Sequence, residues 1–567
     1  MVETECSSGI LFTNQESYIH VQIYEKRDGN ERKNERPHLY ILLLDSVSSF
    51  MAKRALPKTL QYLEDELGAV QMEFLNKLGR NSRPNAFPLF FGKSVEPGSR
   101  ALVGEPPLVP DWDNNEKCRE YLDEYSYVLE EYRKSGYKTL AANDWDIGFP
   151  YYSNCTGFNR PEADHMWRQF ENRMRESWAL LRSHRHHCGE SHLDLLEYME
   201  KFMNSYPGIP KVCYVWPVYL AHDTLKDLYH ADDQFLDFLK RNKKNLDNAF
   251  FFFMADHGPR GEGILEVPLG RYEGNNPMLT VSVPKRYRNT PIHEQLKNKS
   301  RQLMTHFDLH ATFMDILKVQ PSSNFADTSH RSMQPLSKGS SLFREWRETR
   351  NCRTLPIPSQ YCLCQYNKTT IEDQATLKTV GSFLAEQLNI ILQKAGLGEK
   401  CQKQSYYMIH SGAEMKDGNV TLYEVAVYVK PSNGLFSAHV RPTDSGLLLY
   451  SGLNRLNQYG HQADYCVVLS KRLLWCVKFD FGDGAWSEEG SKLDESKLNF
   501  IRGYCPGLLT VNGNKVGAVS EDDLLDGDSD VEDLSKEEDS TRDDSTEWSS
   551  GEEHLGEEDP LCRILTD

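Results

Sequence analysis

Three side chains of the kinds that bind metal ions follow two apolar, strand-like runs of the chain. Asp45 ends the run HLYILLLD, and Asp256-His257-Gly258 follows the run AFFFFMA. The carboxyl ends of neighbouring parallel strands meet at the edge of an α/β sheet where ligands bind. Carboxylate oxygen and neutral imidazole both coordinate divalent cations. Either acid alone is as compatible with a polar cap on a strand, but the two together favour a metal site.

A hydroxyl that could act as a nucleophile lies between these two runs in the sequence. The segment NSRPNAFPLFFG (81–92) is typical of a loop that enters a helix, because Pro84 suits the first helical position. Ser82 then lies just ahead of the helix, close to free backbone N–H groups and to the positive end of the helix dipole. Next to a divalent cation, such a hydroxyl can lose its proton and attack phosphorus or sulfur. The alternative is that Ser82 is an ordinary N-cap.

Two further side chains could act on a substrate. His222 ends a third apolar run, KVCYVWPVYLAH, and its pKa near neutrality would suit a general acid. It could equally bond to a carbonyl group at the strand end. Arg260 follows Asp-His-Gly, and a guanidinium group matches a phosphoryl group well, although a surface ion pair is as compatible with its position.

The motifs also resemble those of a known superfamily. The pattern Ser82-x-Pro84-Asn85-x-x-x-Leu89-x-x-Gly92 is in register with the C/S-x-P-S-R-x-x-L-L-T-G pattern of sulfatases. Together with LLLDSVS, GYKTLAANDW, LAHD, ADHGPRGEG and HFDLHATFMDIL, in this order, it resembles the alkaline phosphatase/sulfatase superfamily. More narrowly, the chain is similar to an uncharacterised sulfatase-like family of animal proteins, known as a domain of unknown function.

The resemblance implies a site built on one divalent metal ion, which could be zinc, manganese, magnesium or calcium. No aspartate between residues 100 and 256 has a histidine four positions later, the pair that two-metal relatives place there. In single-metal relatives the ligands correspond to Asp45, Ser82, Asp256 and His257. The resemblance gives Ser82 and His222 catalytic roles, and it implies that substrate is bound by Asn85, His222 and Arg260.

Departures from the sulfatase pattern bear on the reaction. In the sulfatase pattern, an arginine four residues after the nucleophile is needed for the recognition step that leads to oxidation of the nucleophile to an aldehyde. This chain has Ala86 at that position. The first metal-binding motif of sulfatases usually contains two consecutive aspartates, whereas in this chain Ser46 follows Asp45. Both differences favour an unmodified Ser82 and a metal-dependent hydrolase or transferase of phosphoric mono- or diesters on a small molecule or glycan. Two alternatives remain open, a sulfatase acting on sulfated glycans and a non-catalytic lumenal or extracellular binding protein.

Two other groups of histidines could suggest metal binding but favour other interpretations. The segment HRHHCGESH (184–192) closes no C-x-x-C pattern, and we interpret it as a solvent loop. His306 and His310 lie four residues apart on an expected helix with apolar neighbours. We therefore favour a packed helix over a metal-binding pair.

The order of strand-like and helix-like runs predicts an α/β fold, with a mainly parallel sheet sandwiched by helices as in alkaline phosphatase. Strands are expected at 38–45, 137–143, 211–219, 249–255 and 277–283, and helices at 115–135, 167–182, 224–243 and 302–318. A smaller α+β domain follows, with a helix at 366–396 and strands at 420–430, 434–441 and 463–470. The expected division is a polar lead-in (1–37), a catalytic domain (38–345), a smaller Cys-containing domain (346–515) and a disordered acidic tail (516–567).

Nearly all of the net charge of −18 lies in that tail. From residue 516 onward there are 20 acidic and 3 basic side chains, a balance of −17. Such a segment cannot bury enough apolar surface to offset its chain entropy, so we expect disorder. No basic patch with interleaved aromatic residues indicates binding to nucleic acid.

Signals for the cellular location conflict. The first twenty residues lack the charged start and apolar core of a signal peptide, and no run approaches the ~20 apolar residues of a spanning helix. Thirteen cysteines and possible glycosylation sites at Asn154, Asn298, Asn367 and Asn419 are typical of secreted proteins. Members of the resembled family are secretory or membrane-anchored. We therefore expect the secretory lumen, the cell exterior or a membrane, with a membrane anchor only if an N-terminal segment is missing from this chain.

Overall fold

A computed structural model of the chain describes residues 2–457, except for 9–13, 26–35, 101–102, 104, 146–147, 153, 261–262, 268, 364–367, 395–397, 399–400, 418–419 and 451–452. The predicted acidic tail and the strand predicted at 463–470 lie outside the described residues. The chain divides into two compact units, Met1–Gln365 and Tyr366–Asp567. Among the helices that the structure describes, none is both long and apolar enough to cross a bilayer.

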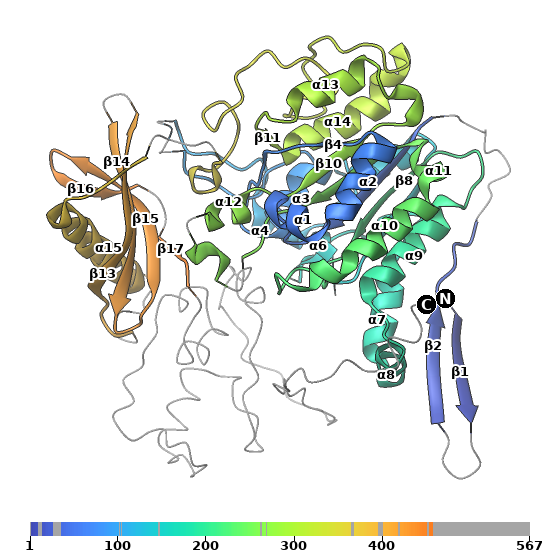
Figure 1. The fold of residues 1–567 in the computed structure, drawn as a ribbon, viewed down its shortest axis with the longest axis horizontal. Helices are drawn as coiled ribbons and strands as arrows, with labels where there is room; N and C mark the ends of the chain where they lie inside the picture. Colours follow the sequence, from blue (N-terminus) through green and yellow to red (C-terminus); the bar gives the residue numbers. More distant parts are fainter. Residues whose placement is uncertain are drawn as a thin grey trace. The chain divides into compact units, whose positions relative to one another are not determined.

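The first unit is built on a seven-stranded sheet with the order β4-β10-β9-β3-β8-β6-β7 (Figure 1). Its strands are β3 (His38–Leu44), β4 (Val70–Gln71), β6 (Lys138–Asn143), β7 (His165–Met166), β8 (Lys211–Trp216), β9 (Ala249–Ala255) and β10 (Leu279–Ser282). The neighbours from β9 to β7 pair in parallel, and β10 is antiparallel to both β9 and β4. The predicted α/β fold with a mainly parallel sheet is therefore confirmed.

Helices cover both faces of this sheet, because successive side chains of a strand point to opposite sides. Leu39, Ile41 and Leu43 of β3 pack against one helical layer, and Tyr40 and Leu42 pack against the other. The first layer contains α3 (Ser82–Phe90), α5 (Val128–Lys134), α13 (Pro291–Lys299) and α14 (His306–Lys318). The second contains α1 (Ser49–Ala55), α2 (Pro57–Leu67), α7 (Arg168–Glu176), α8 (Trp178–His186), α9 (Ser191–Met203) and α10 (Asp232–Arg241).

Short elements connect these layers. They are β5 (Leu75–Asn76), which pairs with β11 (Met304–Thr305), together with α4 (Asn114–Arg119), α6 (Gly148–Tyr151), α11 (Lys243–Leu246) and α12 (Gly270–Asn275). The 3-10 turns are η2 (Asp227–Ala231), η3 (Ile264–Glu266), η4 (Lys285–Tyr287), η5 (Gln320–Ser323) and η6 (Ser359–Tyr361).

Several predicted helices are interrupted where a polar side chain caps a new one. The helix predicted at 115–135 is two helices, α4 and α5, and Asp113 caps α4 by accepting from two backbone N–H groups. The helix predicted at 167–182 breaks at Ser177, whose hydroxyl accepts from the N–H of Leu180 and starts α8. The helix predicted at 224–243 opens as the 3-10 turn η2 before α10. Such local bonds compete with helix continuation.

The N-terminal lead-in forms an antiparallel hairpin of β1 (Val2–Ser8) and β2 (Asn14–His20), which lies beside α8 (Figure 1). The backbone N–H of Ser17 donates to Ser183 Oγ at 2.8 Å. The solvent loop predicted at 184–192 is wrong in part, because this segment includes the last turn of α8 and the first residues of α9.

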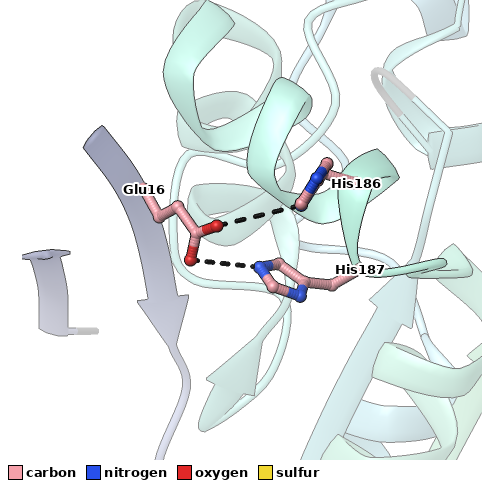
Figure 2. A group of neighbouring side chains, drawn as sticks. All are labelled: Glu16, His186 and His187. Atoms are coloured by element: carbon pink, nitrogen blue, oxygen red, sulfur yellow. Dashed lines mark hydrogen bonds and ion pairs between the residues drawn. The ribbon is translucent and has the colours of Figure 1, made fainter. Parts of the chain in front are cut away.

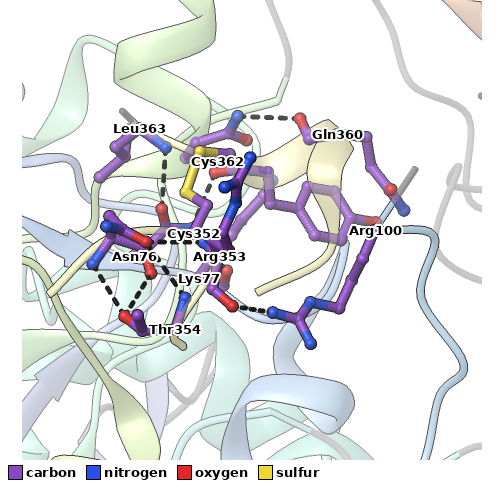
Figure 3. Close-up of a disulfide and its surroundings, with 12 residues drawn as sticks. Asn76, Lys77, Arg100, Cys352, Arg353, Thr354, Gln360, Cys362 and Leu363 are labelled. Carbon is purple, nitrogen blue, oxygen red and sulfur yellow. Dashed lines mark hydrogen bonds between the residues drawn. A yellow bond between two sulfur atoms is a disulfide. The ribbon is translucent and has the colours of Figure 1, made fainter. Parts of the chain in front are cut away.

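The first unit extends further along the chain than the predicted boundary at residue 345. A disulfide between Cys352 and Cys362 closes a loop next to β5 (Figure 3). Asn76 Nδ2 donates to the carbonyl oxygen of Tyr361 at 2.7 Å, and the N–H of Leu363 donates to Asn76 Oδ1 at 2.9 Å. These bonds attach the loop to the first unit.

The second unit packs the helix α15 (Gln374–Lys394) on an antiparallel sheet, which confirms the predicted α+β domain. The helix begins eight residues later than predicted, because Asp373 accepts hydrogen bonds from the N–H groups of Ala375 and Thr376. The strands are β12 (Lys368–Thr370), β13 (Ser405–Asp417), β14 (Val420–Lys430), β15 (Leu435–Thr443), β16 (Gly446–Leu449) and β17 (Asn454–Arg455).

Buried histidines make the stability of the first unit sensitive to acid. Burial lowers the pKa of His38 to about 3, of His306 to about 4 and of His310 to about 3. These imidazoles stay neutral in the folded chain, whereas the unfolded chain binds their protons below its pKa of 6.5. Stability that is present above this pH is therefore lost as the pH falls toward the folded values.

We expect the free energy of unfolding to fall by up to about 1.4 kcal/mol per pH unit for each of these imidazoles between pH 6.5 and 4. Urea denaturation at a series of pH values measures this slope. His310→Leu removes one titrating group and should make the slope shallower. An unchanged slope in this variant would contradict the assignment.

Candidate active site

Asp45 and Asp256 lie next to each other at the carboxyl edge of the sheet. The strands β3 and β9 are parallel neighbours, and Leu44 pairs with Ala255, so the residue that follows each strand reaches the same edge. Asp45, Asp256 and His257 are all buried, and their potential ligand atoms lie within 4.8 Å of one another. The structure thus brings these three predicted ligands together.

The fourth predicted ligand, Ser82, joins this group. His257 Nε2 lies 3.3 Å from Asp256 Oδ2 and 3.9 Å from Asp45 Oδ1. Ser82 Oγ donates to the second oxygen of Asp45, Oδ2, at 3.1 Å. Ligands that share one ion at about 2.0–2.5 Å from each are themselves roughly 3–4 Å apart, so the spacing fits a single cation.

The chemistry of the group also fits a divalent cation. Within the described part of the chain, Asp256 Oδ2 and His257 Nε2 are buried atoms without a hydrogen-bond partner. Burial, and then the neighbouring Asp45, raise the pKa of Asp256 well above its ordinary range. Burial, and then the cationic Arg260 and Lys77, lower the pKa of His257 well below its ordinary range. A divalent ion would compensate two buried carboxylates and bind a neutral imidazole.

The turn after β9 fixes the orientation of His257. Its Nδ1 lies 2.9 Å from the carbonyl oxygen of Gly258, so Nδ1 carries the proton and Nε2 presents its lone pair to the carboxylates. A Cβ atom at Gly258 would lie 1.8 Å from the carbonyl oxygen of Glu273. Only glycine therefore fits this close approach of the Glu273 carbonyl group, directly after the ligand pair.

Sequence reasoning missed two residues that orient Asp45. Ser46 Oγ donates to Asp45 Oδ1 at 2.9 Å, and Trp216 Nε1 lies 3.2 Å from Asp45 Oδ2. The N–H of Ser46 also donates to Asp256 Oδ1 at 3.2 Å. Ser46 reaches both acids because its φ of 57° is left-handed. In the sequence, Ser46 shows only as a departure from the paired aspartates of sulfatases.

The structure changes the interpretation of the Ser82 segment. Asn81, in an extended conformation, is the N-cap of α3, and Ser82 is the first helical residue rather than the residue ahead of the helix. Asn85, predicted to bind substrate, is fully buried. Its Oδ1 accepts from the N–H groups of Leu78 and Gly79, and its Nδ2 donates to the carbonyl oxygens of Gly79 and Asn81. Asn85 therefore holds the loop that presents Ser82.

His222 and Arg260 lie together beside the ligand group. His222 Nδ1 pairs with Asp223 Oδ1 at 2.7 Å, and its Nε2 lies 3.4 Å from a terminal nitrogen of Arg260. The ring of Trp145 lies against the imidazole of His222, with the ring centres 5.1 Å apart. Both His222 and Arg260 act electrostatically on His257. The two residues are thus close enough to the ligand group to meet a substrate bound there.

Lys77 is a further residue that the sequence did not indicate. Its side chain is only 4% exposed, and its Nζ lies over the ring of Tyr361, 4.9 Å from the ring centre. Burial, and then Arg260 and Arg80, lower the pKa of Lys77 to about 7, and Asp256 acts in the opposite direction. Figure 3 shows Lys77 beside the disulfide loop. The position of Lys77 depends on that distant loop, so no local pattern marks it.

Comparison with solved structures finds proteins of one superfamily. An alkaline phosphatase superfamily protein from Vibrio parahaemolyticus is 14% identical, with a TM-score of 0.34, and the match covers 76% of this chain and 84% of that one. A phosphonate monoester hydrolase from Silicibacter pomeroyi is 13% identical, with a TM-score of 0.36 and coverage of 71% and 89%. The lipoteichoic acid synthase of Listeria monocytogenes is 12% identical, with a TM-score of 0.34 and coverage of 54% and 76%.

No curated protein matches the sequence. One family does match, over residues 1–410, and its description is "protein of unknown function (DUF229)". The match spans the whole first unit and enters the second. The chain therefore belongs to the DUF229 family, the sulfatase-like family that its motifs resemble.

Proposed function

We propose that this protein is a metal-dependent hydrolase or transferase of phosphoric esters, with Ser82 as its nucleophile. The observation that carries the proposal is the hydrogen bond of 3.1 Å from Ser82 Oγ to Asp45, an acid that also lies beside Asp256 and His257. A hydroxyl and three ligands thus face one point. Ser82 is also the first residue of α3, where backbone N–H groups favour negative charge.

Each residue of the site has its own role in the proposed reaction. Asp45, Ser82, Asp256 and His257 would hold the ion, which when bound favours the ionised hydroxyl and stabilises charge on the transferring group. Asp45 Oδ2 accepts the hydrogen bond of Ser82 and is placed to take its proton. Ser82 Oγ then bonds to phosphorus while the ester P–O bond breaks in line.

His222 completes both halves of the reaction. It gives a proton to the leaving oxygen, and Asp223 holds its Nδ1. Water or an acceptor alcohol then attacks the phosphoserine and gives its proton to His222, while the bond from phosphorus to Ser82 Oγ breaks. Ser82 recovers its proton from Asp45. Arg260 is placed next to His222 to bind an oxygen of the transferring group.

The position of Ala86 favours phosphoric over sulfuric esters. This residue belongs to α3, is only 1% exposed and packs in the core. No guanidinium group is present at the position where aldehyde formation on a sulfatase nucleophile needs one. An unmodified serine suits attack on phosphorus, with a phosphoserine that water or an alcohol resolves.

The test is a substrate panel with the full chain, loaded with Zn²⁺ or Mn²⁺, together with the intact mass of the protein. Turnover of phosphomonoesters or phosphodiesters by a protein with unmodified Ser82 is the expected result. Cleavage of sulfate esters by a protein that carries an aldehyde at residue 82 would establish the sulfatase alternative. A metal-loaded protein that is inert toward phosphate esters, phosphonates and sulfate esters would establish a binding protein.

Lys77→Met is expected to lower kcat/KM for the phosphoric ester by about 100-fold, because the ammonium group is desolvated beside the site, where charge is most effective. The thermal stability should not fall, since methionine keeps the apolar stem and removes a buried charge. Enzyme kinetics and thermal unfolding measure the two effects.

A matched control is Lys211→Met. Lys211 is 3% exposed, burial lowers its pKa to about 8, and it begins β8, at the end of the strand remote from the site. This variant should keep its activity. Equal activity losses in the two variants would assign the effect of Lys77 to packing.

We also propose that the protein works in the secretory lumen, at the cell exterior or on a membrane. Two disulfides support an oxidising compartment, Cys118–Cys155 and Cys352–Cys362. Asn154 and Asn298, two of the possible glycosylation sites, are exposed. Glycosidase treatment of the protein from animal cells, followed by its mass, tests this location.

A further inference from the structure

A second group of metal-binding side chains gathers where α9 meets α10, on the face of the sheet that α2 also covers. Glu190 directly precedes α9, and His192 lies in the first turn of that helix. His230 comes from the 3-10 turn η2, and Gln234 from the first turn of α10. None of these residues belongs to the site of Asp45 and Ser82. The four side chains thus come from segments about forty residues apart in sequence.

The polar atoms of the group converge on Glu190. Its Oε2 lies 2.8 Å from His230 Nε2 and 3.4 Å from His192 Nε2. Gln234 Oε1 lies 2.6 Å from His192 Nε2, and Gln234 Nε2 donates to the other oxygen of Glu190, Oε1, at 3.2 Å. The two imidazole nitrogens and a carboxylate oxygen of Glu190 lie within 4.8 Å of one another, and the amide oxygen of Gln234 adjoins this group at His192.

One wall of this group is rigid and the other is open. The side chain of His192 is only 4% exposed, and its ring lies against the ring of Phe235 in the core. Glu190 is 34% exposed and His230 is 50% exposed. A cation can therefore enter from solvent and meet a ligand that packing already holds in place.

The distances match tetrahedral zinc. With zinc–ligand bonds of about 2.0–2.1 Å, tetrahedral ligand atoms lie roughly 3.3 Å from one another. The spacings of 2.8 and 3.4 Å around Glu190 Oε2 bracket this value, whereas the 2.6 Å between Gln234 Oε1 and His192 Nε2 is a hydrogen-bond distance that would lengthen when an ion replaces the proton. A proton on His192 Nε2 can satisfy only one of the two oxygens that face it, whereas a cation is satisfied by all the surrounding atoms at once.

A second group of one glutamate and two histidines, at the N-terminal hairpin, is less suited to bind a metal ion (Figure 2). Glu16 Oε1 lies 3.8 Å from His186 Nδ1, and Glu16 Oε2 lies 3.3 Å from His187 Nε2. The hydroxyl of Tyr18, however, lies 2.6 Å from Glu16 Oε2 and 2.7 Å from His187 Nε2, between the atoms that would share an ion. The two imidazoles are also consecutive in sequence, and neither is held in the core as His192 is. This group docks the hairpin onto α8.

We propose that Glu190, His192 and His230 form a second metal site, which binds zinc or another borderline transition metal, with Gln234 Oε1 as the fourth ligand. Such a site would tie α9 to the η2–α10 segment. Imidazole nitrogen and carboxylate oxygen are ligands that these metals accept readily. Gln234 would also fix the carboxylate through its donor to Glu190 Oε1.

The test counts zinc equivalents on the full chain. The protein is stripped with a chelator and titrated with Zn²⁺ alone, and bound metal is measured by calorimetry and elemental analysis. Wild type should bind two equivalents. His230→Gln should lose one equivalent or bind it at least ~100-fold more weakly, and it should keep its fold because His230 is half exposed. Glu190→Gln should behave in the same way.

Two controls separate this site from the others. Asp256→Asn removes the zinc equivalent of the candidate active site, and in that background His230→Gln should remove the second. His187→Gln, in the hairpin group, should change nothing. Unchanged zinc binding in both His230→Gln and Glu190→Gln would overturn the proposal, and so would an equal loss in His187→Gln.

Discussion

Replacing Ser82 with alanine should lower kcat/KM for the phosphoric ester by at least about 1,000-fold, because the variant keeps the ligands but has no atom to bond to phosphorus. The melting temperature should stay within about 2 °C of wild type, since Ser82 is only partly buried and alanine suits its place as the first residue of α3. Steady-state kinetics on the metal-loaded protein and thermal unfolding measure the two effects.

A mass measurement links this loss to the nucleophile. A substrate with a fast-leaving group should leave a phosphoryl adduct on the wild-type peptide that contains Ser82, and none on Ser82→Ala. Ser135→Ala is a matched control, because Ser135 Oγ only bonds to the carbonyl oxygen of Glu131 at the end of α5. Full activity in Ser82→Ala, or an adduct on Ser46 instead, would refute the assigned nucleophile.

Asp256→Asn should weaken the binding of metal at the candidate active site by at least about 100-fold, because it removes an anionic ligand from the centre of the group. The metal-free variant, in contrast, should be at least as stable as the metal-free wild type. The amide removes the repulsion between two buried acids, Asp45 and Asp256. Elemental analysis measures the first effect, and denaturation in a chelating buffer measures the second.

The pH dependence of stability distinguishes this explanation from a simple loss of packing. The folded pKa of Asp256 lies well above its ordinary value of 3.8, mainly through burial. The contribution of Asp256 to the stability of the metal-free protein is therefore complete below pH 3.8 and is lost as the pH rises toward the folded pKa. Asp256→Asn should remove this decline. A variant that retains full metal occupancy at the active site would take Asp256 out of the ligand set.

The sequence predicts the central ligands because a residue that ends an apolar strand can be assigned to the carboxyl edge of the sheet. Asp45 and Asp256 each follow a continuous apolar run, and such runs form neighbouring strands of a parallel sheet. Adjacent parallel strands then place their next residues side by side, as Leu44 and Ala255 do. His257 follows directly, and Gly258 after it leaves room for the close approach of the Glu273 carbonyl group.

Other features depend on contacts between distant segments, which periodicity does not reveal. Lys77 lies beside the candidate active site, and the ring of Tyr361 from the distant disulfide loop lies against its ammonium group. His192 and Glu190 belong to a His-rich stretch that the sequence predicts to be a solvent loop, but α9 begins between them and turns His192 toward the core. Asn85 occupies a motif position, yet its hydrogen bonds serve the loop. The first two cases are decided by packing partners that are remote in sequence, whereas the hydrogen bonds of Asn85 span only four to seven residues.

The Cys352–Cys362 link has a practical consequence for making the protein. It closes a loop with a sequence separation of 10, and such a cross-link stabilises by roughly 3 kcal/mol in the chain-entropy treatment. The loop bonds to Asn76 and covers Lys77, so a recombinant batch from a reducing cytoplasm would have a loosened loop next to Lys77 and the candidate active site. Host cells that export the chain through an oxidising route are the suitable source for every assay described.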